Sequence, residues 1–217
     1  MMADQFVTLY TDDNLMLEKL ETTPFGTNAY VLNCLQSNRC LLFDAPGNSV
    51  EILEHLAGKE VLYIIITHGH MDHIMALEEI YEGLGVKVAA HENDAVGLPV
   101  KADRLLSDGE IIACGSLEVK VIHTPGHTAG SLCFRVGHLL IAGDTIFPGG
   151  PGKTDSPASF NTLLDSIKEK ILTLPDQTRI FSGHGLPTTV GEEKKQIEAF
   201  LARGYGGNLY GDVTWQE

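Results

Sequence analysis

The residues with the clearest chemical potential lie together in the segment THGHMDH, residues 67–73. In extended chain, side chains two positions apart point the same way, so His68 and His70 can bind one ion. The turn that follows aims Asp72 and His73 in another direction. We also expect His73 to begin a helix, whose N-terminus favours the neutral, metal-binding imidazole. The spacing suits two metal ions.

Three more candidate ligands each follow a predicted strand: His127 in HTPGHT, Asp144 in AGD and His184 in SGHG. Loops beyond strand ends are where sheets gather binding groups on a rigid support. Imidazole combined with carboxylate suits zinc, iron or manganese better than magnesium or calcium. Two ions about 3.5–4 Å apart need a bridging carboxylate, and the isolated Asp144 is the best candidate. We expect two divalent cations, zinc first, with iron or manganese as alternatives.

Short apolar runs between turn residues predict the strands that must position these ligands. They cover residues 15–20, 29–35, 40–43, 61–67, 86–90, 111–114, 117–123, 131–136, 138–142 and 179–182. The run VLYIIIT at 61–67 is apolar on both faces, which predicts a central strand covered on each side. Helical spacing predicts helices at 73–81, from a cap at Ser159 or Asn161 to 171, and at 192–202, with 99–108 as a long loop. This pattern predicts an α/β fold of two mixed sheets packed face to face, with helices outside.

Length and composition limit the class of protein. With 217 residues, 43% hydrophobic and 20% charged, the chain has enough apolar content for a sizeable core. We expect one domain over residues 1–217, with 204–217 as a candidate C-terminal extension that either docks or contacts a partner. The sequence has neither a membrane-spanning apolar run nor a basic, apolar start like that of a signal peptide, so we expect a cytoplasmic protein without a membrane contact.

The charge balance argues against nucleic acid as a partner. The formal net charge is −14, and the sequence lacks the basic cluster that phosphate neutralisation needs. The four cysteines lack C-x-x-C spacing, which predicts reduced thiols. We expect a small-molecule partner, and the sequence leaves the oligomeric state open.

The order H-x-H-x-D-H, then the histidines and aspartate of GHT, GD and GH, resembles the metallo-β-lactamase superfamily. The resemblance implies a four-layer αβ/βα sandwich with its site at one edge of the two sheets. It also implies the ligand sets: His68, His70 and His127 for the first metal, Asp72, His73 and His184 for the second, and Asp144 as the bridge.

The segments GDTIF and GKTD, residues 143–147 and 152–155, resemble the hydroxyacylglutathione hydrolase (glyoxalase II type) branch. The resemblance implies that Lys153 helps to bind the carboxylate of the substrate. Which thioester or ester is cleaved, and whether glutathione is part of it, the sequence leaves open.

The leading hypothesis is a binuclear metallohydrolase that cleaves a small, anionic thioester or ester, with a metal-bridging hydroxide as the nucleophile. Asp144 would bridge the metals, and Asp72 would take the proton as the intermediate collapses. The alternative is a mononuclear iron persulfide dioxygenase, an oxidoreductase that would use His68, His127 and Asp144. Lactone hydrolysis and nuclease activity rank below both.

Several other polar residues have two readings. Asp44 in DAPG either forms a turn or orients a metal-bound histidine. His123 either hydrogen-bonds to a ligand or simply packs. We expect His55, His91 and His138 to lie outside the metal site.

Overall fold

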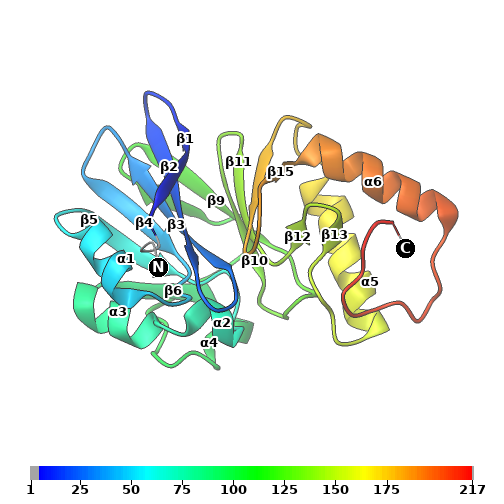
Figure 1. The fold of residues 1–217 in the computed structure, drawn as a ribbon, viewed down its shortest axis with the longest axis horizontal. Helices are drawn as coiled ribbons and strands as arrows, with labels where there is room; N and C mark the ends of the chain where they lie inside the picture. Colours follow the sequence, from blue (N-terminus) through cyan, green and yellow to red (C-terminus); the bar gives the residue numbers. More distant parts are fainter. Residues whose placement is uncertain (1–4, 217) are drawn as a thin grey trace.

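The computed structural model describes residues 5–216, and two large sheets packed face to face form its centre (Figure 1). The first sheet has the order β1 (Val7–Thr11), β2 (Leu15–Thr22), β3 (Thr27–Cys34), β4 (Arg39–Phe43), β5 (Glu60–Ile65), β6 (Lys87–His91) and β7 (Arg104–Leu106). The second has the order β15 (Thr188–Thr189), β14 (Arg179–Ser182), β11 (Leu139–Gly143), β10 (Leu132–Val136), β9 (Leu117–His123) and β8 (Ile111–Cys114). A small separate sheet pairs β12 (Ile146–Phe147) with β13 (Gly150–Pro151).

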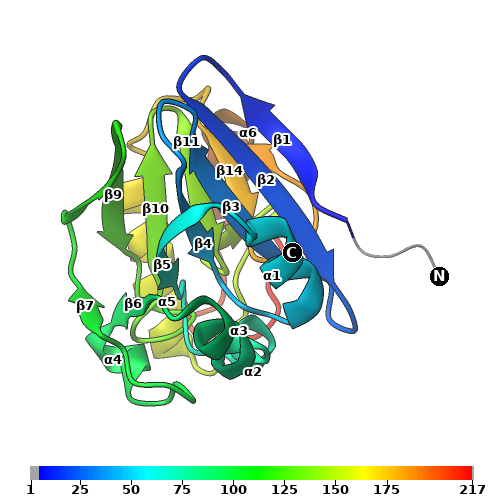
Figure 2. The same cartoon turned by 90° about the vertical axis from the view of Figure 1, so that its left-hand side faces the viewer.

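Helices cover the outer faces of both sheets. On the first sheet lie α1 (Ser49–Leu56), α2 (Met71–Ile74) and α3 (Leu77–Leu84), and α4 (Glu92–Ala95) follows β6. On the second lie α5 (Pro157–Ser166), the π-helical turn η1 (Ile167–Ile171) and α6 (Val190–Arg203). Figure 2 shows the layers in depth, with α1 and α3 in front and α5 behind the two sheets. The expected four-layer αβ/βα sandwich is confirmed.

Three apolar clusters hold these layers together. The central cluster fills the space between the sheets and includes Leu32, Phe43 and Phe134. Because strand side chains alternate, Val31 points the other way and packs with the helices of the first sheet. Burial of each such side chain contributes about 1.5–3 kcal/mol, so both sheets form rigid supports for the loops at their edge.

Two parts of the predicted secondary structure are wrong. The helix expected over 73–81 is broken, because Ala45 N–H donates to the His73 carbonyl (2.9 Å) and Ala76 N–H donates back to the Ala45 carbonyl (2.9 Å). These hydrogen bonds with Ala45, just after β4, take the place of the backbone hydrogen bonds that would continue the helix, so α2 ends at Ile74. The loop expected over 99–108 contains β7, a short edge strand that pairs with β6.

The N-terminus of α5 also differs from the prediction. The helix starts earlier than expected, at Pro157 after Ser156, whose side chain accepts from Ser159 N–H (3.1 Å). Proline suits the first helical position because its missing N–H is not needed there.

The C-terminal segment docks on the second half of the chain. Trp215 is buried, and its Nε1–H donates to the buried Glu193 carboxylate (3.0 Å). Its backbone N–H donates to the Gly149 carbonyl (2.8 Å). The expectation of one domain over 1–217 stays a prediction, and residues 1–4 and 217, on which the signal-peptide and tail expectations partly rest, lie outside the described residues. Within 5–216, no helix has the length and apolar character needed to cross a membrane.

Candidate metal centre

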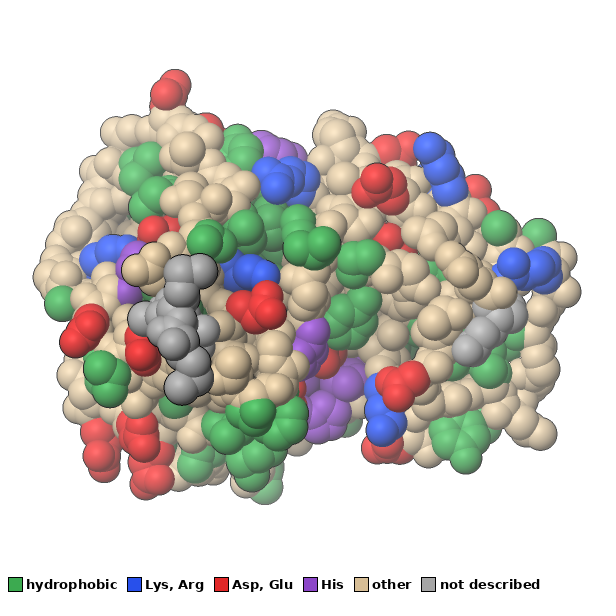
Figure 3. Space-filling view, in the orientation of Figure 1, with side chains coloured by type: hydrophobic (Ala, Val, Ile, Leu, Met, Phe, Trp, Pro, Cys, Tyr) green, Lys and Arg blue, Asp and Glu red, His purple; other side chains and the backbone are tan. Residues whose placement is uncertain are grey.

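All seven candidate ligands lie at one edge of the two sheets, on loops or a short helix that follow strands. The first sheet provides His68 and His70 after β5, and Asp72 and His73 in α2; the second provides His127 after β9, Asp144 after β11 and His184 after β14. Figure 3 shows histidine side chains gathered at the surface between the two halves. The fold therefore brings together residues more than a hundred positions apart.

A first group combines His68, His70 and His127. One ring nitrogen from each lies within 4.8 Å of the others. The Nε2 atoms of His68 and His127 point at each other across 3.2 Å. His68 is buried and His70 is exposed, so this group reaches from the interior to the surface.

A second group combines Asp72, His73 and His184, whose candidate ligand atoms also lie within 4.8 Å of one another. Asp72 Oδ2 lies 3.1 Å from His184 Nε2 and 3.7 Å from His73 Nε2. Each group therefore takes members from both halves of the sandwich.

Asp144 lies between the two groups. Its Oδ2 is 3.6 Å from Nε2 of both His127 and His184, and its Oδ1 is 3.3 Å from His73 Nε2. One carboxylate thus faces a histidine of the first group and two of the second. This is the position that a bridging ligand requires.

Two buried atoms at this centre test whether the site fits a metal. His73 Nε2 and Asp144 Oδ1 are both buried and both lack a hydrogen-bond partner. An unsatisfied buried polar atom costs about 1–3 kcal/mol, and a cation between these atoms would satisfy both. Gly183 keeps the space open, because a Cβ there would overlap Asp144 Oδ1 and lie 2.6 Å from His73 Cε1. The donor set of imidazoles and carboxylates therefore fits divalent transition-metal ions.

The electrostatics favour metal binding at several of these atoms. Burial lowers the pKa of His68 and His127, which favours neutral imidazoles. Burial alone would raise the pKa of Asp144, but the His73 ring 3.3 Å away outweighs it, so the net shift is downward. The hydrogen bond with His184 is the largest cause that lowers the pKa of Asp72. Both aspartates are therefore carboxylates at neutral pH.

His73 differs from the sequence prediction. It is the third residue of the four-residue helix α2, which begins at Met71, so His73 does not open the helix as expected. Burial opposes its protonation, but the charges of Asp44 and Asp144, together with the hydrogen bond to Asp44, raise the pKa of His73 to about 10. The adjacent carboxylates thus favour a protonated imidazole, and a cation that binds Nε2 would release this proton.

Asp44 orients His73, which is one of its two predicted roles. His73 Nδ1–H donates to Asp44 Oδ2 (2.8 Å), so Nε2 faces the centre. Thr67 fixes the carboxylate in turn, because its N–H donates to Oδ1 (2.7 Å) and its hydroxyl donates to Oδ2 (2.8 Å). The same hydroxyl contacts His68 Nδ1 (3.1 Å).

Backbone and side-chain groups hold the other ligands in place. His127 Nδ1–H donates to the Lys153 carbonyl (2.7 Å), which turns Nε2 toward the centre. The Thr27 hydroxyl donates to Asp72 Oδ2 (3.1 Å). Sequence reasoning missed Thr27 and Thr67, because a single threonine in or after a strand carries no local signal of such a role.

The remaining histidines make contacts elsewhere. His123 bonds to the Ala129 carbonyl (3.0 Å) and stacks on His91 with ring centroids 4.0 Å apart, rather than bonding to a ligand side chain. His55 contacts Glu18 (3.0 Å), and His138 packs edge-on against Tyr10.

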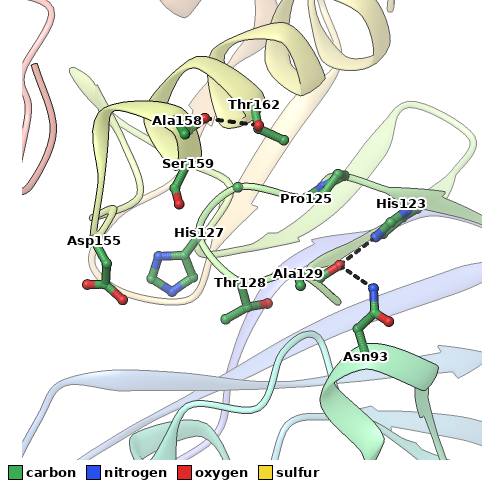
Figure 4. Close-up of a pocket in the computed structure, with 11 residues that line it drawn as sticks. Asn93, His123, Pro125, His127, Thr128, Ala129, Asp155, Ala158, Ser159 and Thr162 are labelled. Atoms are coloured by element: carbon green, nitrogen blue, oxygen red, sulfur yellow. Dashed lines mark hydrogen bonds between the residues drawn. The ribbon is translucent and has the colours of Figure 1, made fainter. Parts of the chain in front are cut away.

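A cavity of about 540 Å³ opens beside His127, between its loop and the start of α5. Figure 4 shows Asp155 and Ser159 on one side and Asn93 with Thr128 on the other. The side chain of Lys153 is exposed and is not among the groups that line this cavity.

Residues 22–184 match the sequence profile of the family described as the metallo-beta-lactamase superfamily. The chain belongs to the metallo-β-lactamase superfamily. The match covers the chain from β3 to β14 and every candidate ligand. Divalent metals are the cofactors of this superfamily, and the His and Asp groups described above form the candidate site in this member.

Named relatives of this superfamily member include hydrolases. The chain is 36% identical to the probable metallo-hydrolase YqgX of Bacillus subtilis, over 82% of this chain and 94% of that protein. It is 29% identical to the hydroxyacylglutathione hydrolase GloC of Haemophilus influenzae, over 82% of this chain and 95% of that protein. The crystal structure of ETHE1 from Myxococcus xanthus aligns with a TM-score of 0.71 and 26% identity, covering 88% of this chain and 81% of that one.

Proposed function

We propose that this protein is a metallohydrolase that holds two divalent cations and cleaves a small thioester or ester. The observation that carries the proposal is the position of Asp144, whose carboxylate faces both ligand groups and whose buried Oδ1 has no hydrogen-bond partner. A second ion is favoured because Asp72, His73 and His184 form a complete group of their own. The similarity to proteins named metallo-hydrolase and hydroxyacylglutathione hydrolase supports the reaction class.

In this proposal His68, His70 and His127 would hold the first ion, Asp72, His73 and His184 would hold the second, and Asp144 would contribute to both sites. When bound, the two cations supply a water acidified toward a pKa of about 7 and a positive charge for the developing oxyanion. Zinc is the first candidate for both positions, with iron or manganese as alternatives.

The protein side chains orient the ligands and transfer the proton. Asp44 fixes the His73 ring through Nδ1, and the Lys153 carbonyl fixes the His127 ring in the same way. We assign proton transfer toward the leaving group to Asp72, because its side chain is 26% exposed, against 11% for Asp144. The more exposed carboxylate of the two is the one that can exchange a proton with water.

The surroundings of the centre suggest how a small substrate is held. The cavity beside His127 can accept the part of the substrate that does not react. The Lys153 side chain is exposed next to the backbone carbonyl that holds His127, so we propose that it binds a carboxylate of an anionic substrate. With a net charge of −14, we propose a small molecule rather than a nucleic acid as the partner.

Elemental analysis of anaerobically purified protein, followed by assays with thioesters, lactones and glutathione persulfide, tests the proposal. We expect two zinc, iron or manganese ions per chain, and hydrolysis of at least one thioester or ester. A His138→Ala control, altered beside Tyr10 rather than at the centre, should keep the same metal content. One iron per chain with persulfide-dependent oxygen uptake would overturn the proposal in favour of the dioxygenase built on His68, His127 and Asp144.

A further inference from the structure

The short helix α4 places one carboxylate between the two loops that carry the first ligand group. Asp94 Oδ2 accepts from Gly69 N–H (2.9 Å) and from the Thr128 hydroxyl (2.6 Å), and Asp94 Oδ1 accepts from Gly130 N–H (2.9 Å). Gly69 lies between His68 and His70, while Thr128 immediately follows His127. Both oxygens of a single side chain are therefore used to join the two loops.

We infer that Asp94 is a positioning residue that sets the distance between the two halves of the first metal site. These hydrogen bonds do not reach a candidate ligand side chain. They come instead from the backbone between His68 and His70 and from residues that follow His127. The inference rests on the proposed function, since it assigns Asp94 a role toward a metal ion.

The fit around Asp94 is tight, which gives the contact a defined geometry. A Cβ added at Gly130 would lie 2.5 Å from Asp94 Cγ, and one added at Gly69 would lie 3.4 Å from Asp94 Cβ. Glycine at position 130 therefore lets that backbone approach the carboxylate, whereas a Cβ at position 69 would only be in van der Waals contact with Asp94. Asn93, the preceding residue of α4, adds a bond from its side-chain amide to the Ala129 carbonyl (3.1 Å).

Hydrogen bonds to an ionised carboxylate are stronger than those between neutral groups, so Asp94 resists separation of the loops. The two loops follow strands of different sheets, β5 and β9, and their histidines must converge on one point. His68 Nε2 and His127 Nε2 lie 3.2 Å apart in this arrangement. Removing the Asp94 hydrogen bonds between the two loops should therefore weaken metal binding at the first site more than at the second.

The test is a Co²⁺ titration of the metal-depleted full chain, followed by absorption spectroscopy. Asp94→Asn keeps the shape of the side chain but turns one acceptor oxygen into a donor. We expect one of two Co²⁺ equivalents to bind about 10–100-fold more weakly and to change its visible absorption bands, because supporting contacts of metal ligands have effects of this size. The second equivalent should keep its affinity.

Asp12→Asn is the matched control. Asp12 also accepts three hydrogen bonds, from Asn14 N–H (2.8 Å), Leu15 N–H (2.9 Å) and the Tyr10 hydroxyl (2.9 Å), but it lies in the turn between β1 and β2. This variant should lose stability without losing either Co²⁺ equivalent.

Thr128→Val is a milder second variant, which removes one donor to Asp94 and keeps the inference testable if Asp94→Asn folds poorly. Thr128→Val should weaken binding of the same Co²⁺ equivalent by a smaller factor. Combined with Asp94→Asn it should add little, because both changes affect the same hydrogen bonds between the two loops.

Three results would overturn the inference. The first is wild-type affinity and absorption for both equivalents in Asp94→Asn or in Thr128→Val. The second is an equal loss of Co²⁺ in Asp12→Asn, which would show a general effect of stability. The third, a wild-type chain that binds no Co²⁺, would overturn the proposed function together with the inference, whereas the first two leave the proposed function intact.

Discussion

Gly183→Ala tests whether the open space in front of Asp144 is needed for function. Gly183 follows β14 and directly precedes His184. Its backbone avoids the left-handed region, so alanine introduces no conformational strain there. Its N–H donates to the Gly143 carbonyl (2.7 Å) and its carbonyl accepts from Asn28 N–H (2.7 Å), and neither bond involves the added methyl group. The change therefore acts through the space that the methyl group occupies.

The size of the effect follows from the geometry. The new Cβ would overlap Asp144 Oδ1 and lie 2.6 Å from His73 Cε1. Nonbonded carbons are most stable at about 3.5–4.0 Å, so the ligand groups must move by about 1 Å. A displacement of this size at a reacting centre lowers the rate by about 100-fold, and overpacking reduces stability by about 1–3 kcal/mol. We expect kcat/KM to fall by about 100-fold or more and metal content to fall below two ions per chain.

The assay combines elemental analysis, kinetics with a cleaved thioester or ester, and thermal unfolding. Gly206→Ala is the control, because a Cβ at that position meets no atom within 4 Å and the backbone there also accepts alanine. It carries the same change in chain entropy without touching the centre. Gly206→Ala should match the wild type in all three measurements.

Two results would refute this reasoning. If Gly183→Ala kept two ions per chain and the wild-type kcat/KM, then the space between Asp144 and His73 would not be a ligand-binding space. A loss of stability with unchanged metal content would lead to the same conclusion, since overpacking alone explains it.

Three further predictions concern other groups. Asp144→Ala should lower metal content below two ions per chain and reduce turnover by several orders of magnitude; full metal occupancy with the wild-type rate would rule out the bridging role. Glu18 is buried, and burial opposes its charge, but His55 and Lys59 (3.0 and 3.2 Å away) hold the pKa of Glu18 below its usual value. The charged Glu18 side chain therefore stabilises the fold above that usual value, about pH 4.3. This stabilisation is lost as the pH falls through the lowered pKa. Glu18→Gln should therefore cost about 1–3 kcal/mol in urea unfolding at pH 7 and less as the pH falls below about 4, whereas a pH-independent cost would exclude the charge as the cause. Lys153→Met should raise KM about 10-fold for an anionic substrate and leave kcat unchanged, since its backbone carbonyl remains, and an equal change for a neutral substrate would argue against a charge contact.

The strands with strong alternation could be predicted from the sequence to the residue. In β9, LEVKVIH, buried and exposed residues alternate over the first four positions, and the structure gives the predicted bounds Leu117–His123. The same holds for β8, Ile111–Cys114, where every second residue is buried. A strand that packs one face on the core has alternating apolar and polar residues, and this alternation predicts where the strand begins and ends.

Other elements depend on partners far away in the chain, and these were missed. β1, Val7–Thr11, has no fully buried residue, and it forms because β2 offers an edge. β7 likewise forms on the edge of β6, and its Leu105 is 55% exposed. The break between α2 and α3 is caused by hydrogen bonds to Ala45, about thirty residues earlier. No local pattern encodes such contacts.

The candidate site shows the same division. That the candidate ligands would lie close together could be predicted, because the histidines and aspartates stand in a compact motif and at strand ends. The groups that orient them could not, because the pairs are remote: Thr27 is 45 positions from Asp72, and Asp94 is 25 positions from Gly69. For Lys153 the sequence suggested a role of the side chain, whereas the structure adds a role of its backbone carbonyl.

In the proposed function, the distribution of the candidate ligands would couple metal binding to the packing of the two sheets. The first group takes two histidines from the half with β5 and one from the half with β9, and the second group takes two ligands from α2 and one from the loop after β14. Neither half alone holds a complete group. An ion that binds only the packed arrangement stabilises it by mass action, so its binding free energy opposes separation of the sheets across the central apolar cluster. Asp94 and Asp144 also oppose separation of the two sheets, because each contacts groups from both halves.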